Sequence, residues 1–453
     1  MGNKRVSEPN VRSWCKSLNR EQWFVLFGAS LAWTFDCFNQ QIFNLARDGA
    51  LEDLIPDRKL AIEYGPYTTS VLLIGWALGG LVFGALGDRH GRARMLTLCI
   101  LLYSASTGLS ALSTGMLDFC IYRFIGGLGI GGVFGLAVAL VADSVPDHIR
   151  APALGILQSV STWGNLTAGL LGMLLGSLAE RQALPFALKH WQALFWVGAL
   201  PGPFCAWATH HLKEPSKWVD ARAESGERGI RFGSYRYLLS HPTWSKHAWL
   251  GLIACSSGIV GLWGIGNFHP KIVGDIVEQH LTSPGASAGA LASQKAYWRS
   301  TGLVLQNAGA FFGMLLLAKI AQMKGRRLAL ALASSLSLLS TVIVFRYMRE
   351  LHQMYWMLPL MGFGQLSVFG VYAVYLPELF PTSLRSTGTS FCYNVGRIVA
   401  ATAPFTLSQV TMRLGGDVEG FRTAGIWMSL LLLLGVAVWP FLPETKDRPL
   451  PVD

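Results

Sequence analysis

Apolar runs of about 20 residues recur along this chain of 453 residues, from Gln22 to Leu442. An α-helix needs a run of about that length to cross the hydrocarbon core of a membrane. Charged residues make up only 14% of the chain, whereas an average soluble domain has about 25%. The pattern therefore predicts an all-α, multi-pass integral membrane protein.

The runs predict twelve transmembrane helices, which a longer polar segment at 211–246 divides six and six. Two six-helix bundles joined by a central linker are a layout typical of secondary transporters. The expected spans lie near 22–46, 67–87, 94–113, 117–142, 153–179, 188–210, 247–272, 297–320, 327–346, 352–377, 384–411 and 420–442.

Basic residues gather in the links that would lie on one side of the membrane. They occur in the N-terminal segment, in the link after the second span, in the central polar segment and in the link after the eighth span. By the positive-inside rule these links are cytoplasmic. We therefore expect both termini to be cytoplasmic and the membrane to be the bacterial inner membrane.

The expected organisation has five parts: a cytoplasmic N-terminal segment (1–21), an N-terminal six-helix bundle (22–210), a cytoplasmic linker (211–246), a C-terminal six-helix bundle (247–442) and a cytoplasmic tail (443–453). A further polar stretch at about 274–296 is rich in Ser, Gly and Ala. We expect it to be an outer loop with little defined structure.

Two motifs occur twice in the chain, at nearly the same offset. Asp143-x2-Pro146-x3-Arg150 follows the fourth span, and Glu378-x2-Pro381-x3-Arg385 follows the tenth span, 235 residues later. The basic turn around Gly91 has a partner around Gly325, 234 residues later. A common offset indicates an internal duplication, so the two six-helix bundles should be pseudo-symmetric.

Several stretches resemble one family of transporters. The turn Gly87-Asp88-Arg89-His90-Gly91-Arg92 resembles the loop between helices two and three of the major facilitator superfamily. Segments 122–131, 213–219 and 443–450 are similar to motifs of its proton-coupled sugar porters. Segment 378–388 with the following Gly396-Arg397 resembles its metabolite–proton symporters and organic-ion transporters. The resemblance implies the major facilitator fold, which exposes a central site alternately to each side.

The resemblance also implies a gate at the cytoplasmic ends of the helices. In the family, the acid of the basic turn meets the positive N-terminal end of a helix in the other half. We further expect Asp143 to pair with Arg150 and Glu378 to pair with Arg385, in contacts that open in one state. The alternative is that these residues only set the topology or cap helix ends. The gating candidates are Gly87, Asp88, Arg89, Gly91, Arg92, Asp143, Arg150, Arg326, Glu378 and Arg385.

Asp36 is an acid inside an otherwise apolar span. A charge near the bilayer centre costs roughly 2.5–3.5 kcal/mol, so a functional role is the first hypothesis. Arg123 in the fourth span should lie at a similar depth, and the resemblance implies that such an Asp and Arg take part in proton coupling. A static ion pair is the alternative. His269 is a further proton-coupling candidate, for which an ordinary interface histidine is the alternative.

Arg397 lies near mid-membrane, where its forked guanidinium suits a carboxylate. Pairing with Asp36 or with a backbone carbonyl is the alternative. The glycines and proline of 261–270 predict a broken helix that lines a cavity. Other polar and aromatic residues inside the spans are substrate-binding candidates, although each could instead join two helices. The substrate-binding candidates are Asn39, Gln40, Gln158, Trp163, Asn165, Trp263, Asn267, Gln365, Tyr372, Tyr375, Asn394 and Arg397.

These features predict proton-coupled uptake of a small organic acid. A proton-coupled sugar or polyol transporter, a drug or organic-cation exporter and a non-transporting membrane receptor are the alternatives. An enzyme is not expected, because no nucleophile–base set, phosphate loop or metal cluster occurs, and we expect no cofactor beyond the coupling proton. The net charge of +11 does not indicate a nucleic-acid binder in so apolar a chain. The expected partners are the small-molecule substrate and membrane lipids, with the protein a monomer.

Overall fold

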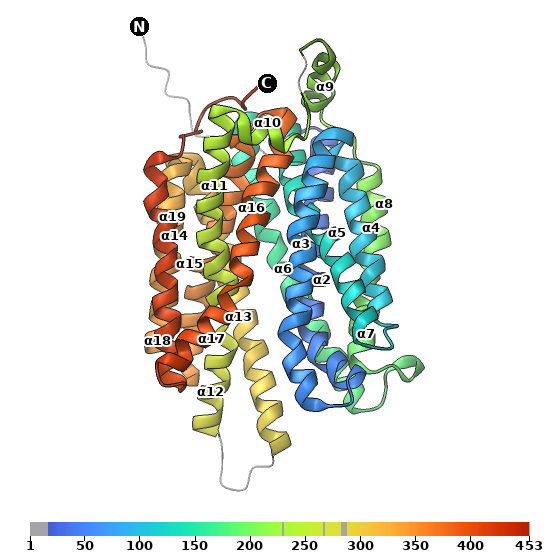
Figure 1. Cartoon of the computed structure of the whole chain (residues 1–453), viewed down its shortest axis with the longest axis vertical. Coiled ribbons are helices and arrows are strands. Elements are labelled where there is room, and N and C mark those ends of the chain that lie inside the picture. The colour runs from blue at the N-terminus through green and yellow to red at the C-terminus, as the bar shows by residue number, and fades with distance from the viewer. Residues whose placement is uncertain (1–16, 229–230, 266–267, 282–287, 453) are drawn as a thin grey trace.

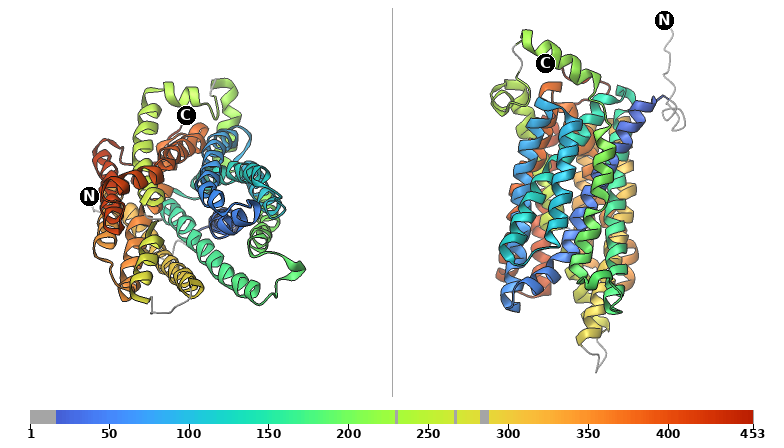
Figure 2. Two further views of the ribbon diagram at one scale, coloured as in Figure 1. Left: turned by 60° about the horizontal axis from the view of Figure 1, so that its bottom comes forward. Right: turned by 90° about the vertical axis from the view of Figure 1, so that its right-hand side faces the viewer.

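The computed structural model of the protein describes residues 17–452 except 229–230, 266–267 and 282–287. Within these ranges the regular structure is helical, without a strand. The helices run roughly side by side along one axis, and those of 20–210 and of 242–441 form two groups (Figures 1 and 2). The predicted all-α, two-bundle architecture is confirmed.

The first group follows the chain from α2 to α8. Its elements are α2 (Arg20–Leu54), α3 (Arg58–His90), α4 (Arg92–Ser110), α5 (Met116–Ser144), α6 (Asp147–Glu180), η1 (Pro185–Ala187), α7 (His190–Ala199) and α8 (Pro201–His210). Two shorter helices, α9 (Ser216–Arg228) and α10 (Tyr235–Ser240), lie in the link between the groups.

The second group follows the chain from α11 to η8. Its elements are α11 (Pro242–Val260), η2 (Gly261–Ile265), α12 (His269–Leu281), α13 (Ala288–Lys324), α14 (Arg326–Tyr347), η4 (Leu351–Gln353), α15 (Met354–Tyr375), η5 (Leu376–Leu379), η6 (Thr382–Leu384), α16 (Arg385–Ala401), α17 (Ala403–Arg413), α18 (Val418–Ser429), η7 (Leu430–Leu432), α19 (Leu433–Val438) and η8 (Trp439–Phe441).

Each predicted span falls on one helix or on one interrupted helix. Six helical segments of the described chain are long and apolar enough, by length and composition, to cross a membrane. The other spans carry charged residues, as α2 does at Asp36, or are interrupted, as between α7 and α8 at Pro201. A proline lacks the backbone donor that a continuous helix requires, so the helical hydrogen bonding is interrupted at this point.

The two ends of the bundle differ. One end carries α9, α10, the start of α2 and the C-terminal segment, at the top of Figure 1. We call this end the linker side and the other end the opposite side. Between the two groups, α3 packs against α16 and α6 packs against α13.

Within each half, glycines bring two helices into backbone contact. A Cβ atom on Gly79 of α3 would lie 2.0 Å from the carbonyl oxygen of Leu128 in α5. In the other half, a Cβ atom on Gly313 of α13 would lie 2.2 Å from the carbonyl oxygen of Phe363 in α15. Gly313 follows Gly79 by 234 residues, so the duplication seen in the motifs extends to the packing.

The expected outer loop at 274–296 is wrong in part, because α12 continues to Leu281 and α13 begins at Ala288. Residues 282–287 lie outside the described residues. The whole of α12 is amphipathic, with Ile272, Val273, Ile276 and Val277 all buried. These residues recur at helical spacing, so the extension packs against α13 although its overall composition is polar.

Gly79→Ala should destabilise the fold, because the new methyl group would overlap the backbone of α5. Overpacking of this kind costs typically about 1–3 kcal/mol. The purified variant should unfold at a lower temperature than the wild type. Gly169→Ala is the matched control, because a Cβ atom there meets nothing within 4 Å. Identical melting of the two variants would contradict the α3–α5 contact.

Candidate functional site

Asp143, at the end of α5, joins the two halves on the linker side. Its carboxylate accepts hydrogen bonds from Arg92, at the start of α4, and from Arg385, at the start of α16. Arg92 belongs to the same half as Asp143, and Arg385 belongs to the other half. Arg92 also donates to the carbonyl oxygen of Thr382 in the other half, at 2.9 Å. All three charged side chains are buried, so removing one of them would leave buried charge without compensation.

Glu378, in η5, occupies the corresponding place in the second half. Its carboxylate accepts two hydrogen bonds of 2.9 Å from Arg326, at the start of α14. A third, of 3.3 Å, comes from Arg150, at the start of α6 in the first half. The hydroxyl of Thr445, in the C-terminal segment, donates a fourth at 2.6 Å. Asp143 and Glu378 therefore each bind one arginine of their own half and one of the other.

The ion pairs are crossed compared with the pairing expected from the sequence. Asp143 binds Arg385 rather than Arg150, and Glu378 binds Arg150 rather than Arg385. The physical reason is that the two copies of the motif face each other across the interface. Each arginine lies in the first turn of a helix at this interface and reaches the acid of the opposite copy.

Asp88, at the end of α3, meets the N-terminus of α16. Its carboxylate accepts from the backbone N–H groups of Ser386 (3.2 Å) and Thr387 (2.8 Å) and from the Thr387 hydroxyl (2.7 Å). Arg92 also donates to Asp88, at 3.1 Å. A carboxylate at a helix N-terminus interacts favourably with the helix dipole. This contact thus adds to the closure of the linker side, and it occurs where the family resemblance led us to expect it.

The other candidates in this turn support the backbone or the link between the halves. Gly91 has a φ angle of 106°, which a residue with a side chain rarely adopts. A Cβ atom on Gly87 would lie 2.1 Å from Leu136 of α5. Arg89 donates to the carbonyl oxygen of Phe232, just before α10, at 3.1 Å.

Two glutamates that we did not select from the sequence cap the helices after the basic turns. Glu214 accepts from the backbone N–H of Arg92 at 2.8 Å, at the start of α4. Glu444 accepts from the backbone N–H of Arg326 at 2.9 Å, at the start of α14. Burial raises the pKa of Glu444, but hydrogen bonds from backbone N–H groups outweigh this effect and lower its pKa overall. The signal in the sequence is an acid beside a proline after the sixth span of each half.

Arg397 of α16 lies between the halves, inside the bundle. Its guanidinium carbon lies 3.8 Å from the centroid of the Trp76 ring, in α3, and 4.2 Å from that of Tyr393. It donates to the side-chain oxygen of Asn394 at 2.8 Å. Among the described residues Arg397 has no ion-pair partner within 4 Å, and its Nε atom is buried without an acceptor. The cation is therefore stabilised mainly by aromatic rings and one neutral amide.

Asp36 lies fully buried in α2, and neither carboxylate oxygen has a hydrogen-bond partner among the described residues. The expected pair with Arg123 is not formed in this conformation. Arg123 instead donates to the carbonyl oxygen of Ser106 at 2.9 Å and lies over the ring of Phe195. Arg397 is close enough for its charge to act on Asp36. The structure thus places the unpaired acid near Arg397 rather than beside Arg123.

The predicted break in the seventh span is confirmed. The α-helix α11 ends at Val260 and continues as the π-helical turn η2. Gln365 donates to the carbonyl oxygen of Gly261 at 3.0 Å, so it bonds backbone at the start of the break. Trp263 of η2 contacts Trp76 of the first half, with ring centroids 5.7 Å apart. His269 is buried just after the break, and the candidate Asn267 lies outside the described residues.

The remaining substrate-binding candidates take part in helix contacts or are partly or largely exposed. Asn165 donates to Asn307 in the other half at 2.9 Å, and Gln158 accepts from Trp33 at 3.0 Å. Three candidates donate to backbone carbonyl oxygens: Asn39 to Gly198, Tyr372 to Ala254, and Tyr375 to Pro443 on the linker side.

Trp163 and Gln40 are the more accessible candidates. Trp163 is 58% exposed and shares an exposed stripe of α6 with Leu170 and Leu174. An apolar stripe of this kind suits contact with lipid. Gln40 is half-buried in α2.

The fold and these contacts define a class of protein. Two pseudo-symmetric helical bundles are joined by ion pairs at one end, and the buried cation of Arg397 lies between them. This architecture is that of a multi-pass membrane transport protein whose halves move relative to each other.

Comparison with known proteins identifies the family. Residues 60–404 match the Major Facilitator Superfamily, and the chain belongs to it. The protein is therefore a transporter and not an enzyme.

Relatives cover nearly the whole chain. The cis,cis-muconate transport protein of Acinetobacter baylyi is 28% identical over 384 residues, covering 84% of this chain and 85% of the relative. The niacin transporter of the same species is 25% identical over 446 residues, covering 93% of both chains. The structure of the proton:xylose symporter XylE of E. coli has a TM-score of 0.70 at 18% identity, covering 95% of this chain and 98% of that one, and it supports the fold alone.

Asp143→Asn should open the linker side, because the neutral amide cannot compensate both Arg92 and Arg385. Ser390 is buried against Gly84 of α3. The substitution Ser390→Cys, made in a variant without the native cysteines, therefore reports this opening. Its labelling by a water-soluble maleimide should become at least about tenfold faster, since breaking a buried pair costs up to 3–5 kcal/mol. Asp48→Asn, which changes an exposed acid, is the control. Unchanged labelling in Asp143→Asn would contradict the role of this contact.

Proposed function

We propose that the protein is a proton-coupled symporter that brings a small organic acid across the bacterial inner membrane. The observation that carries the proposal is Arg397, a buried guanidinium between the halves without an ion-pair partner among the described residues. A buried cation of this kind is costly unless an anion compensates it. The planar fork of arginine matches a carboxylate with two parallel hydrogen bonds.

The surroundings of Arg397 support an anionic substrate that both halves contact. Trp76 belongs to the first half, whereas Tyr393, Asn394 and Arg397 belong to the second. A carboxylate bound here would therefore contact groups whose separation changes when the halves move. Two relatives are named for muconate and niacin, both of which are carboxylates. This agrees with the choice of an acid over a sugar.

Asp36 is the proposed proton carrier. An ionised carboxylate costs several kcal/mol to bury unless it is paired, so the present conformation suits a protonated Asp36. Relative movement of the halves would change its distance from Arg397 and, with it, the balance between the neutral and ionised acid. Binding of a carboxylate to Arg397 would withdraw that cation from Asp36 and link the two events.

The linker side is the proposed cytoplasmic side. Basic residues concentrate there, as the positive-inside rule requires. Asp88, Asp143 and Glu378 then form a cytoplasmic gate, which is closed in this conformation. Substrate would enter from the opposite side, and opening would require the crossed ion pairs to separate. We propose that the protein acts as a monomer in contact with membrane lipids.

Arg397→Lys should weaken binding of a carboxylate, because lysine keeps the charge but loses the fork. Hydrogen bonds to charged groups contribute about 1.5–3 kcal/mol, so the affinity for cis,cis-muconate or nicotinate should fall tenfold or more. Thermal stabilisation of the purified protein by these acids, sugars and amines measures the effect. Arg422→Lys is the matched control, because Arg422 is buried in the same half and donates to a backbone carbonyl oxygen.

A response confined to sugars or amines would contradict the organic-acid proposal. Thermal stabilisation by carboxylates that is the same in Arg397→Lys as in the wild type would contradict the role of Arg397.

Asp36→Asn should remove coupling to the proton gradient while leaving exchange of substrate possible, because asparagine mimics the protonated acid but cannot release a proton. In proteoliposomes, uptake driven by an imposed pH gradient should fall at least about tenfold, whereas counterflow should persist. Asp48→Asn should retain both activities. Wild-type rates of both activities in Asp36→Asn would contradict the coupling role.

A further inference from the structure

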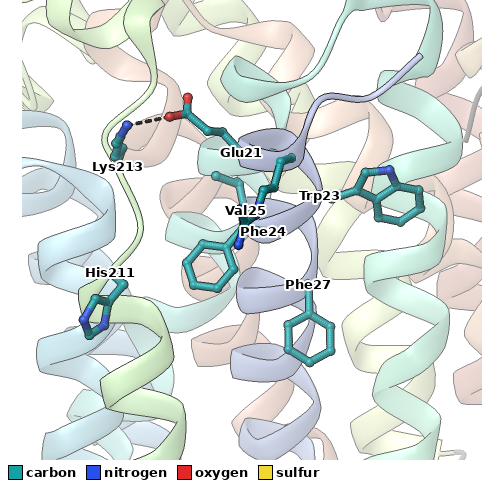
Figure 3. A pocket seen from close by; sticks show the side chains of 8 residues that line it. Glu21, Trp23, Phe24, Val25, Phe27, His211 and Lys213 are labelled. Carbon is teal, nitrogen blue, oxygen red and sulfur yellow. Dashed lines mark hydrogen bonds and ion pairs between the residues drawn. The ribbon is translucent and has the colours of Figure 1, made fainter. Parts of the chain in front are cut away.

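A cavity of about 620 Å³ opens beside the start of α2, on the linker side of the first half (Figure 3). It is separate from the gate and from the cluster around Arg397. Its walls come from two segments that are distant in the sequence. The lining residues that matter here are Arg20, Trp23, Phe24 and Phe27 of α2, and His211 and Lys213 after α8.

The rim of the cavity is cationic. Lys213 pairs with Glu21 at 2.5 Å, as the dashed line in Figure 3 marks. Arg20 has no ion pair within the described ranges, so the rim carries one net positive charge. The positive character of the rim comes from these side chains and not from the first backbone N–H groups of α2, since the side chain of Asn19 already caps that helix.

The wall below the rim is aromatic. Phe24 and Phe27 follow Arg20 at i+4 and i+7, on one face of α2 and roughly 6 and 10 Å further along the helix. Phe27 is 57% exposed. His211 lies on the other wall, where its ring nitrogen hydrogen-bonds the carbonyl oxygen of Trp207 at 2.7 Å. Tryptophans such as Trp23 and Trp207 are typical of the membrane–water interface, which places the rim at the level of lipid headgroups.

We propose that this cavity binds one anionic phospholipid of the phosphatidylglycerol type. The phosphate accepts hydrogen bonds from Arg20 and Lys213, and an acyl chain lies against Phe24 and Phe27. A headgroup with one negative charge complements the single excess charge of the rim. The charge of segment 1–16 does not complement this rim, because it carries Lys4, Arg5, Arg12 and Lys16 against one acid, Glu8.

Native mass spectrometry of the full-length protein, titrated with phosphatidylglycerol or phosphatidylethanolamine, tests this site independently of the transported substrate. The wild type should bind the first phosphatidylglycerol at least tenfold more tightly than phosphatidylethanolamine. In Arg20→Ala/Lys213→Ala the phosphatidylglycerol affinity should fall roughly thirtyfold, the equivalent of about 1 kcal/mol for each cation.

Two further variants control for charge and folding. Arg20→Lys/Lys213→Arg should retain the preference for phosphatidylglycerol. Arg236→Ala, which removes an exposed cation of α10 outside the cavity, should also retain it. Equal binding of the two lipids by the wild type would overturn the proposal even if the double alanine variant fails to fold. Wild-type affinity in the double alanine variant would overturn it, as would displacement of phosphatidylglycerol by an equal concentration of inorganic phosphate.

Discussion

The crossed ion pairs on the linker side hold the two halves together. Asp143 and Glu378 each bind an arginine that their own half supplies and an arginine that the other half supplies. In a buried setting, losing one partner leaves an uncompensated charge, which strongly destabilises the contact. Because the motif is duplicated, the clusters around Asp143 and Glu378 join the two halves with the same kind of carboxylate–arginine contact. The contact between the halves on the linker side is therefore sensitive to single charge changes.

Glycines allow close contact between the backbones of paired helices within each half. The contacts of α3 with α5 and of α13 with α15 leave no room for an added methyl group. The charged contacts between the halves depend instead on side chains, such as the carboxylates of Asp143 and Glu378. The second half also contains one break in a helix, at η2. There the side chain of Gln365 donates a hydrogen bond to the backbone where the regular α-helix ends.

The buried polar residues around Arg397 and Asp36 are incompletely paired, unlike the crossed ion pairs on the linker side. Arg397 lies on the rings of Trp76 and Tyr393, and the carboxylate of Asp36 has no hydrogen-bond donor among the described residues. Buried polar groups are normally satisfied. Within the part of the chain that the structure describes, Asp36 lacks a hydrogen-bond donor and Arg397 lacks an ion-pair partner. The coupling and binding roles proposed for these two residues depend on this incompleteness.

The sequence by itself determined the helical class, the expected spans, the duplication and the charged residues that meet on the linker side, because apolar length, charge and motif spacing are local properties. It also indicated the broken seventh span from its glycines and proline. Only the tertiary structure decided which charges meet. Asp143 and Arg385 are 242 residues apart, and their pairing depends on which helix ends face each other. The packing of the helices likewise decides that Arg123 binds Ser106 rather than Asp36. It also places Trp76, an ordinary apolar residue in the sequence, against Arg397.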